Sequence, residues 1–511
     1  MKKESFVYGS ILLVIINFIV RIIDFTYDVM LSKFLGAEAM GLFQMAMSIL
    51  MIFLIISTVG IPTAVSRLVA EQNSRKNHYT IDKILKVALF ITLFLSILFS
   101  LIIIIFGENI ALRVFRDKKM TLALYLLIPA IVVISISSIL RGYYYGLKLI
   151  MVPSVSQIIE HVTRFVIILG FLYYNYPVEP KYGAFIAIAG ISIGEVFDLI
   201  WLTYMLKPWK RKPRHVESNK IYTRTVVGQI LPIAMPIGIS GLLNVILRFI
   251  NSILIPQNLV KIGYTNGEAM ATFGRITGMT MPLIMLPFIV TSAMVINLVP
   301  NLSEQMALKN YRNVRHNIMF SIKITLMAAI PLTGLYIFFS EPLGFFLYGD
   351  LEVGKFINIM AYGTIFMALQ HTFSGILNGL SKHIMVTLNR LLGMIVQVLA
   401  IYFLVGNPRF GINGFFIGFL SAGMVTFILD IVTIRKVIKL KIDYMDIILK
   451  PLLATIIMVL TMDNGIKLFY GYYSNVWIFL FNLIIGVLAY IFVLYTTKAI
   501  PKKPFRKLIE G

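Results

Sequence analysis

The residues of this chain with the clearest capacity for chemistry lie in its first apolar segment. Asn17, Arg21, Asp24 and Asp28 are four, three and four residues apart, which places them on one face of a helix. Charged groups inside a membrane span cost about 2.5–3.5 kcal/mol each on insertion scales, so this face should meet a cavity or another helix rather than lipid. The alternative is a self-contained ion pair between Arg21 and Asp24 that lets the helix pack tightly.

A similar polar face recurs in a later apolar segment. Asn244, Arg248 and Asn251 repeat the first face, with a neutral amide at the position of Asp24. Arg275 lies in the next segment and has no carboxylate within four residues along the helix. A guanidinium group in this setting favours an anion. Structural alternatives are that Arg248 bonds backbone carbonyls or snorkels, and that Arg275 reaches the external headgroups.

Further ionisable groups lie inside apolar segments. Glu160 and Arg164 are four residues apart, in the order that favours an intrahelical ion pair, and His161 beside them is a candidate proton relay. Three other acids have no basic partner nearby in the sequence: Glu195, Asp198 and Asp430. They either bind a coupling cation or pair with a polar group on a neighbouring helix. The candidates for ion coupling are Asp24, Asp28, Glu160, Glu195 and Asp198.

Membrane helices must position these residues. The chain is 59% hydrophobic and 14% charged, whereas a soluble domain is about 25% charged. This composition excludes a compact cytosolic enzyme and a disordered chain. At roughly 20 apolar residues per span, we expect spans at 6–32, 40–66, 84–106, 120–147, 153–175, 182–206, 225–256, 268–300, 317–339, 355–380, 385–405, 411–437, 446–470 and 476–497.

The first six spans are repeated by the next six. Residues 17–24 match residues 244–251 at an offset of 227, and Glu71-Gln72 matches Glu304-Gln305 at an offset of 233. Six is an even number, so both halves enter the membrane in the same orientation. We therefore expect an all-α polytopic membrane protein with about fourteen transmembrane helices: two six-helix lobes related by a pseudo-two-fold axis along the membrane normal, plus two C-terminal helices.

This repeat divides the chain into four parts. They are an N-lobe over 1–206, a basic cytoplasmic linker over 207–224, a C-lobe over 225–440, and a final part over 441–511 with spans thirteen and fourteen and a basic cytoplasmic tail. Polybasic segments beside a membrane are usually attracted to anionic headgroups, which is the simpler interpretation of the linker.

The net charge of +23 would suggest nucleic-acid binding in a soluble protein, but the positive-inside rule explains it here. With the N-terminus in the cytoplasm, cytoplasmic segments hold 31 of the 46 Lys and Arg residues, Arg141 among them, and external loops hold 10. This asymmetry predicts that both termini are cytoplasmic, with no nucleic-acid partner. The exception is the external loop Arg113–Lys119, which carries four basic residues.

Signatures of enzymatic chemistry are missing from the sequence. There is no cysteine, no phosphate-binding loop Gly-x4-Gly-Lys-Ser/Thr and no HExxH helix, and the six histidines lack metal-ligand spacing. We expect that the protein binds no cofactor and no metal, and that it is not an enzyme. Without an ATP site, transport would be driven by an ion gradient, the membrane potential or the substrate gradient.

The order of these features resembles the stage V sporulation protein B branch of the multidrug/oligosaccharidyl-lipid/polysaccharide exporter superfamily, close to the lipid II flippases. The resemblance covers nearly the whole chain, including the two helices beyond the repeat. It rests on Arg21-x6-Asp28-x4-Lys33-x2-Gly36, Thr-Gly278-Met-x-Met-Pro282-Leu-x3-Pro287 and Leu-Val-Pro300-Asn-Leu-Ser-Glu304.

The resemblance implies two lobes around a cationic cavity, whose arginines bind the pyrophosphate of an undecaprenyl-linked sugar. Arg21 and Arg275 match cavity arginines of that family, while two further family arginines fall at Tyr27 and Ser48. We expect substrate binding by Arg21, Arg275, Arg248, Asn17, Asn244 and Asn251. The implied protein is a monomeric flippase for lipid-linked saccharides such as lipid II in the bacterial cytoplasmic membrane, in contact with membrane lipids and cell-wall synthesis proteins, with a role in sporulation.

Two alternatives stay open. In an ion-coupled exporter of cationic or amphipathic compounds, Asp24 and Asp28 would bind the drug or the coupling cation, and Arg21 would neutralise one of them. In a non-transporting scaffold for cell-wall or spore assembly, the polar faces would serve packing alone.

Overall fold

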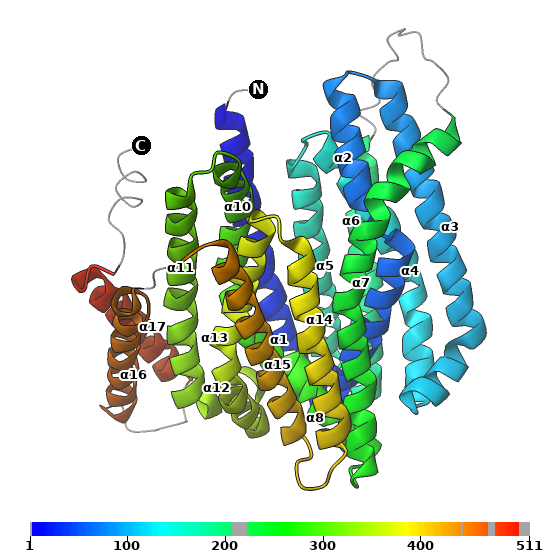
Figure 1. Ribbon diagram of the computed structural model, residues 1–511. Helices are drawn as coiled ribbons and strands as arrows, with labels where there is room; N and C mark the ends of the chain where they lie inside the picture. Colours follow the sequence, from blue (N-terminus) through cyan, green and yellow to red (C-terminus); the bar gives the residue numbers. More distant parts are fainter. Residues whose placement is uncertain (1–2, 207–221, 441–442, 469–475, 500–511) are drawn as a thin grey trace. The chain divides into compact units, whose positions relative to one another are not determined.

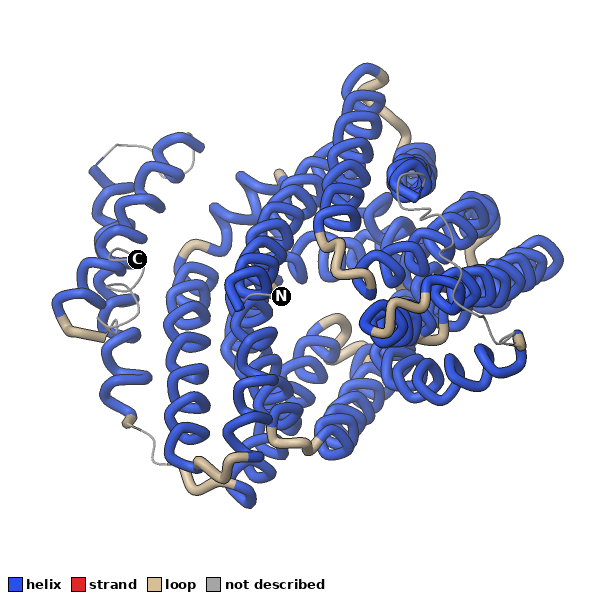
Figure 2. Tube along the Cα trace, turned by 90° about the horizontal axis from the view of Figure 1, so that it is seen from above, coloured by secondary structure: helices blue, strands red, loops and turns tan. Residues whose placement is uncertain are grey.

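The computed structural model describes residues 3–206, 222–440, 443–468 and 476–499 (Figure 1). All regular elements in these ranges are helices, joined by short loops (Figure 2). Eleven of them are long and apolar enough to cross a membrane, and the bent pair Asn266–Ile284 and Pro287–Ala307 supplies a twelfth span. The predicted all-α polytopic membrane fold is confirmed.

The described helices belong to two compact units, Met1–Gly278 and Met279–Gly511. The first unit contains α1 (Lys3–Thr58), α2 (Ile61–Ser74), α3 (His78–Ile110), α4 (Lys119–Gly146), α5 (Met151–Tyr174), α6 (Pro180–Leu206), α7 (Thr223–Lys261) and α8 (Asn266–Gly274). Two turns of π-helix belong with them, η1 (Ala111–Phe115) and η2 (Arg275–Thr280), the second of which continues past the end of the unit.

The second unit begins with short helical turns and continues with long helices. They are α9 (Met281–Ile284), α10 (Pro287–Ala307), α11 (Tyr311–Phe338), α12 (Ser340–Tyr348), α13 (Leu351–Gly379), α14 (His383–Ala400), η3 (Ile401–Val405), α15 (Asn413–Val437), η4 (Met445–Leu449), α16 (Lys450–Leu468) and α17 (Val476–Thr496). An apolar core packs α10, α11, α13 and α15 together around residues such as Leu302, Ile318, Phe373 and Ile434.

The first unit extends beyond the predicted N-lobe, because α7 packs against α1, α2 and α3, and α8 packs against α1 and α7. A repeat in sequence and compactness in space are different properties, so the six-plus-six repeat stays a prediction. Residues 207–221, most of the predicted basic linker, lie outside the described residues, as does the tail from residue 500.

Helix α1 contains the predicted span 6–32 and most of the predicted span 40–66, whose last residues lie in α2. The two parts of α1 meet at a kink. The bend is at Gly36, whose φ of 72° and ψ of 175° lie outside the helical region. A residue with a side chain would be strained at this φ, and glycine is not. Gly36 therefore lets one continuous chain fold into two arms.

Small residues bring α7 and α8 close to the second arm of α1. A methyl group added at Gly274 of α8 would clash with the carbonyl oxygen of Ala37, and one added at Gly41 would clash with that of Met270. The Ser48 and Ser252 hydroxyls are hydrogen-bonded at 2.7 Å between α1 and α7. Such close approach of helix backbones is typical of packing in membranes.

Gly274→Ala should destabilise the protein by about 1–3 kcal/mol, because the added methyl group forces α8 away from α1. The measurement is the free energy of unfolding in detergent. Gly170→Ala in α5 is the matched control, because nothing lies within 4 Å of a methyl group added there. Equal unfolding free energies for the two variants would contradict the close contact.

Candidate functional site

A buried charged cluster joins three helices of the first unit around Arg141 of α4. Its Nη2 lies 2.8 Å from Glu160 Oε2 of α5, and 2.9 Å from Asp198 Oδ1 and 3.6 Å from Glu195 Oε2 of α6. The Arg141 side chain is 18% exposed and that of Asp198 is 0% exposed. One guanidinium group therefore serves three carboxylates away from water.

A second arginine extends the cluster to α1. Arg164 Nη2 of α5 donates to Asp24 Oδ1 at 3.0 Å and lies 2.9 Å from His161 Nδ1. His161 Nδ1 lies 2.6 Å from the same Asp24 oxygen. The predicted pair between Arg164 and Glu160 is present at 3.9 Å, so Asp24 is the closer partner.

The aromatic ring of Tyr27 supports Arg164 from α1. The Arg164 Cζ lies 5.1 Å from the centre of this ring, within the range of a cation–π interaction. Tyr27 is buried. At one of the two positions where the related family would place a cavity arginine, this chain therefore holds the guanidinium of Arg164 against a tyrosine.

The cluster carries more negative than positive groups. Asp28 lies one turn after Asp24 on α1, within electrostatic range of Asp24, Arg164 and His161. Asp198 Oδ2 is buried and accepts no hydrogen bond in the part of the chain that the structure describes. If all five carboxylates ionise and His161 is neutral, two guanidinium groups leave an excess of three negative charges, which buried carboxylates tolerate only with protons or cations nearby.

The structure thus brings together all five acids predicted for ion coupling, although no observation tests their role. It excludes the alternative of a self-contained pair between Arg21 and Asp24, because Asp24 pairs across to α5, where Arg164 and His161 approach it together. Arg141, counted above with the cytoplasmic segments, lies inside α4 among three acids.

The sequence offered one signal for Arg141. Glu160, Glu195 and Asp198 are acids in apolar helices, and such acids need a cation. Arg141 is the guanidinium group that meets them. In the second unit, Asp430 of α15 accepts a hydrogen bond from Asn389 Nδ2 of α14 at 2.8 Å. This acid therefore pairs with a polar side chain of a neighbouring helix.

The arginines predicted to bind substrate lie on three helices of the first unit. Arg21 on α1 and Arg248 on α7 are exposed, and neither forms an ion pair with any residue that the structure describes. Arg275 is half-buried and directly follows Gly274, where α8 meets α1. Arg21 and Arg248 contrast with Arg141 and Arg164, which carboxylates surround.

The depths of these arginines along their helices are similar. The Gly36 bend, the end of α7 and the start of α8 lie together, because Glu38 lies beside Gly267 and one pocket is lined by both Lys261 and Asn266. At 1.5 Å per residue, Arg21, Arg248 and Arg275 lie about 22, 20 and 14 Å along their helices from this end. A hydrocarbon core is about 30 Å thick, so each of these distances is shorter than the thickness of that core.

The predicted amides are less completely placed. The side chains of Asn17 and Asn244 lie outside the described residues. Asn251 is half-buried on α7 beside Ser252, and its Oδ1 accepts no hydrogen bond from the described residues. The predicted substrate-binding set therefore stays a prediction, with its arginines and one amide located.

Comparison with known proteins decides the family. The sequence profile of the family described as "Polysaccharide biosynthesis protein" matches residues 6–306, more than half of the chain. The chain belongs to this polysaccharide biosynthesis protein family. A second profile, MatE, matches residues 236–403.

Relatives of this polysaccharide biosynthesis family member include two proteins of Bacillus subtilis (strain 168). Stage V sporulation protein B is 26% identical over 445 residues, which are 86% of each chain. Lipid II flippase MurJ is 22% identical over 414 residues, which are 76% of this chain and 75% of that one. The resemblance to the stage V sporulation protein B branch of the exporter superfamily is confirmed.

Solved structures agree on the fold. A structure described as "Lipid II flippase MurJ, inward closed conformation" matches with a TM-score of 0.70 at 16% identity, covering 98% of this chain and 100% of that one. An inward-facing multidrug resistance MATE family transporter matches with a TM-score of 0.67 at 14% identity, covering 82% of this chain and 98% of that one. This family member is a multi-pass membrane protein.

Proposed function

We propose that this protein is a flippase that moves an undecaprenyl-pyrophosphate-linked saccharide across the bacterial cytoplasmic membrane by alternating access. The observation that carries the proposal is the set of arginines inside apolar helices, Arg21, Arg248 and Arg275, the first two of which have no carboxylate partner among the described residues. The relatives named as a lipid II flippase and a sporulation protein support a peptidoglycan precursor as the substrate, for the spore cortex.

Arginine suits this substrate for physical reasons. A pyrophosphate diester carries about two negative charges and several acceptor oxygens, and a guanidinium group offers planar, bidentate donors to them. Arginine keeps its charge where a buried lysine can lose it. In the proposed cycle the arginines bind the phosphate-bearing head from the cytoplasmic side. A change to the outward-open state then releases the head outside, while the polyprenyl tail stays in lipid.

The acidic cluster supports ion coupling of this cycle. Asp24, Asp28, Glu160, Glu195 and Asp198 together carry more negative charge than Arg141 and Arg164 neutralise. We propose that protons or a cation supply the difference, and that their uptake and release bias the two states of the protein. Both termini are then cytoplasmic, and the protein works as a monomer beside cell-wall synthesis proteins.

The same excess of carboxylates favours a second candidate, an ion-coupled exporter of cationic or amphipathic compounds. Charge removal separates the two. Arg21→Ala and Arg275→Ala should abolish activity in a flippase and be mild in a cation exporter. Asp24→Asn should impair both, because Asp24 belongs to the acidic cluster proposed above for ion coupling, so the arginine variants decide between the two functions. A non-transporting scaffold would tolerate all three changes, provided that the protein still inserts.

The experiment that tests the proposal is headgroup exposure in vesicles containing the purified protein. Fluorescently labelled lipid II is placed in both leaflets, and a membrane-impermeant quencher reports the labels that reach the outside. We expect the quenched fraction to rise with time only in vesicles that contain the protein. Absence of protein-dependent exposure, with a known flippase active in parallel, would overturn the proposal.

A further inference from the structure

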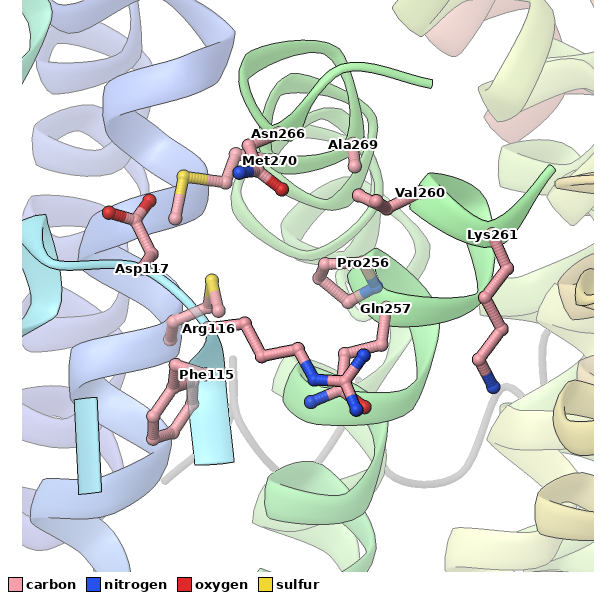
Figure 3. A pocket seen from close by; sticks show the side chains of 11 residues that line it. Phe115, Arg116, Asp117, Pro256, Gln257, Val260, Lys261, Asn266, Ala269 and Met270 are labelled. Atoms are coloured by element: carbon pink, nitrogen blue, oxygen red, sulfur yellow. The ribbon is translucent and has the colours of Figure 1, made fainter. Parts of the chain in front are cut away.

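A pocket of about 90 Å³ lies in the first unit, at the end that contains the Gly36 bend (Figure 3). Its apolar surface comes from Met45, Phe115, Pro256, Ala269 and Met270. Its polar surface comes from Arg116, Asp117, Gln257, Lys261 and Asn266. The pocket therefore combines an apolar wall with cationic and amide donors.

Two cations of this pocket are not neutralised by the described residues. Arg116 forms no ion pair with them, and Lys261 Nζ donates to an uncharged partner, Asn258 Oδ1, at 2.9 Å. Asp117 is already engaged, because its Oδ1 accepts the backbone N–H of Lys119 at 2.7 Å where α4 begins. Figure 3 shows the Arg116 guanidinium beside Gln257 and the Asp117 carboxylate on the other side of the turn.

The turn that carries Arg116 is held in place on both sides. Gln257 Nε2 of α7 donates to the carbonyl oxygen of Val114 at 2.6 Å. The Phe115 ring is buried, with its centre 6.2 Å from that of Phe249. Arg116 itself has a φ of 56°, in the left-handed region that ends the preceding π-helical turn. These contacts fix the backbone of the turn from which the exposed Arg116 side chain extends beside the pocket.

The basic residues here also contradict the charge pattern of the rest of the chain. The segment Arg113–Lys119 holds four basic residues on the side that the positive-inside rule predicts to be external. Glu38 neutralises one of them, since its Oε1 lies 2.8 Å from Lys119 Nζ. The substrate site proposed above uses none of these residues, so they need a separate explanation.

The pocket can hold more than one water molecule. One water needs about 10–15 Å³ of such space, so a pocket of about 90 Å³ has room for a small polar group such as a phosphate. Phosphate oxygens accept from guanidinium, ammonium and amide donors, and the apolar wall suits the carbon chain of a lipid. We propose that this pocket binds the phosphate of an anionic lipid headgroup.

This site is distinct from Arg21, Arg248 and Arg275, and its test is a binding measurement that does not depend on flipping. Purified full-length protein is titrated in detergent with dihexanoyl phosphatidic acid, with dihexanoyl phosphatidylcholine and with inorganic phosphate, and heat is recorded. We expect phosphatidic acid to bind more tightly than the other two probes. Free phosphate that binds as tightly as phosphatidic acid would overturn the lipid assignment.

Variants locate the site. Arg116→Gln and Lys261→Gln should each weaken phosphatidic acid binding by about tenfold or more, the size expected for loss of a hydrogen bond to a charged group. Lys118→Gln is the matched control, because Lys118 is exposed in the same turn but does not line the pocket. Unchanged affinity in both pocket variants, or an equal loss in the Lys118 control, would overturn the proposal.

Discussion

Arg141→Gln should lower the free energy of unfolding by about 3–5 kcal/mol, because removal of one partner leaves buried charge uncompensated. Arg141 Nη2 lies within 3.6 Å of carboxylate oxygens from Glu160, Glu195 and Asp198. Glutamine keeps hydrogen-bonding capacity but not the charge. The measurement is denaturant unfolding of the purified protein in detergent micelles.

Two further variants identify the cause of this loss. Arg75→Gln is the matched control, since its ion pair with Glu71 is largely exposed and such pairs contribute about 0–1 kcal/mol. Glu195→Gln and Asp198→Asn, added together to Arg141→Gln, should recover much of the stability by removing the unpaired charge. A triple variant no more stable than Arg141→Gln would show that charge is not the reason.

Loss of both Arg21 and Arg275 should slow flipping of lipid II by about 10² to 10⁴-fold, since each hydrogen bond to a charged group contributes about 1.5–3 kcal/mol. The double variant Arg21→Gln, Arg275→Gln removes two permanent charges from helices α1 and η2 while keeping polar side chains. Initial rates of headgroup exposure in vesicles measure the effect.

The control for this loss is again Arg75→Gln, which removes one exposed charge just after the end of α2 and should flip at the wild-type rate. Protein content per vesicle and the unfolding midpoint must match between variants, so that a lower rate reports transport. A correctly inserted double variant with the wild-type rate would remove the arginines from the mechanism.

The fold was accessible from the sequence because membrane helices are encoded locally. A run of apolar residues about 20 long is a span wherever it lies in the chain. The polar face of α1 was equally visible, because four-residue spacing fixes which side chains share a helix face. The bend at Gly36 was not predicted, although the two spans that it joins were. Glycine is frequent in membrane helices, so a single glycine does not indicate a bend.

The partners of the charged residues were not accessible in this way. Local spacing suggested Arg21 with Asp24 and Arg164 with Glu160, whereas Asp24 meets Arg164 from another helix at 3.0 Å. A buried charge must pair with an opposite charge nearby to offset the cost of its desolvation. Which charges lie nearby depends on how α1, α4, α5 and α6 pack. Arg141 was not recognised as a partner of the buried acids for the same reason, because those acids lie at least nineteen residues away in the chain.

The central claim is that guanidinium groups of this protein recognise the pyrophosphate of a lipid carrier. The measurement that tests it most directly is the affinity of undecaprenyl pyrophosphate and of uncharged undecaprenol for wild-type protein and for the Arg21→Gln, Arg275→Gln variant, by native mass spectrometry. We expect the wild type to prefer the pyrophosphate by about a hundredfold or more, and the variant to lose most of this preference. An undiminished preference in the variant would contradict the account.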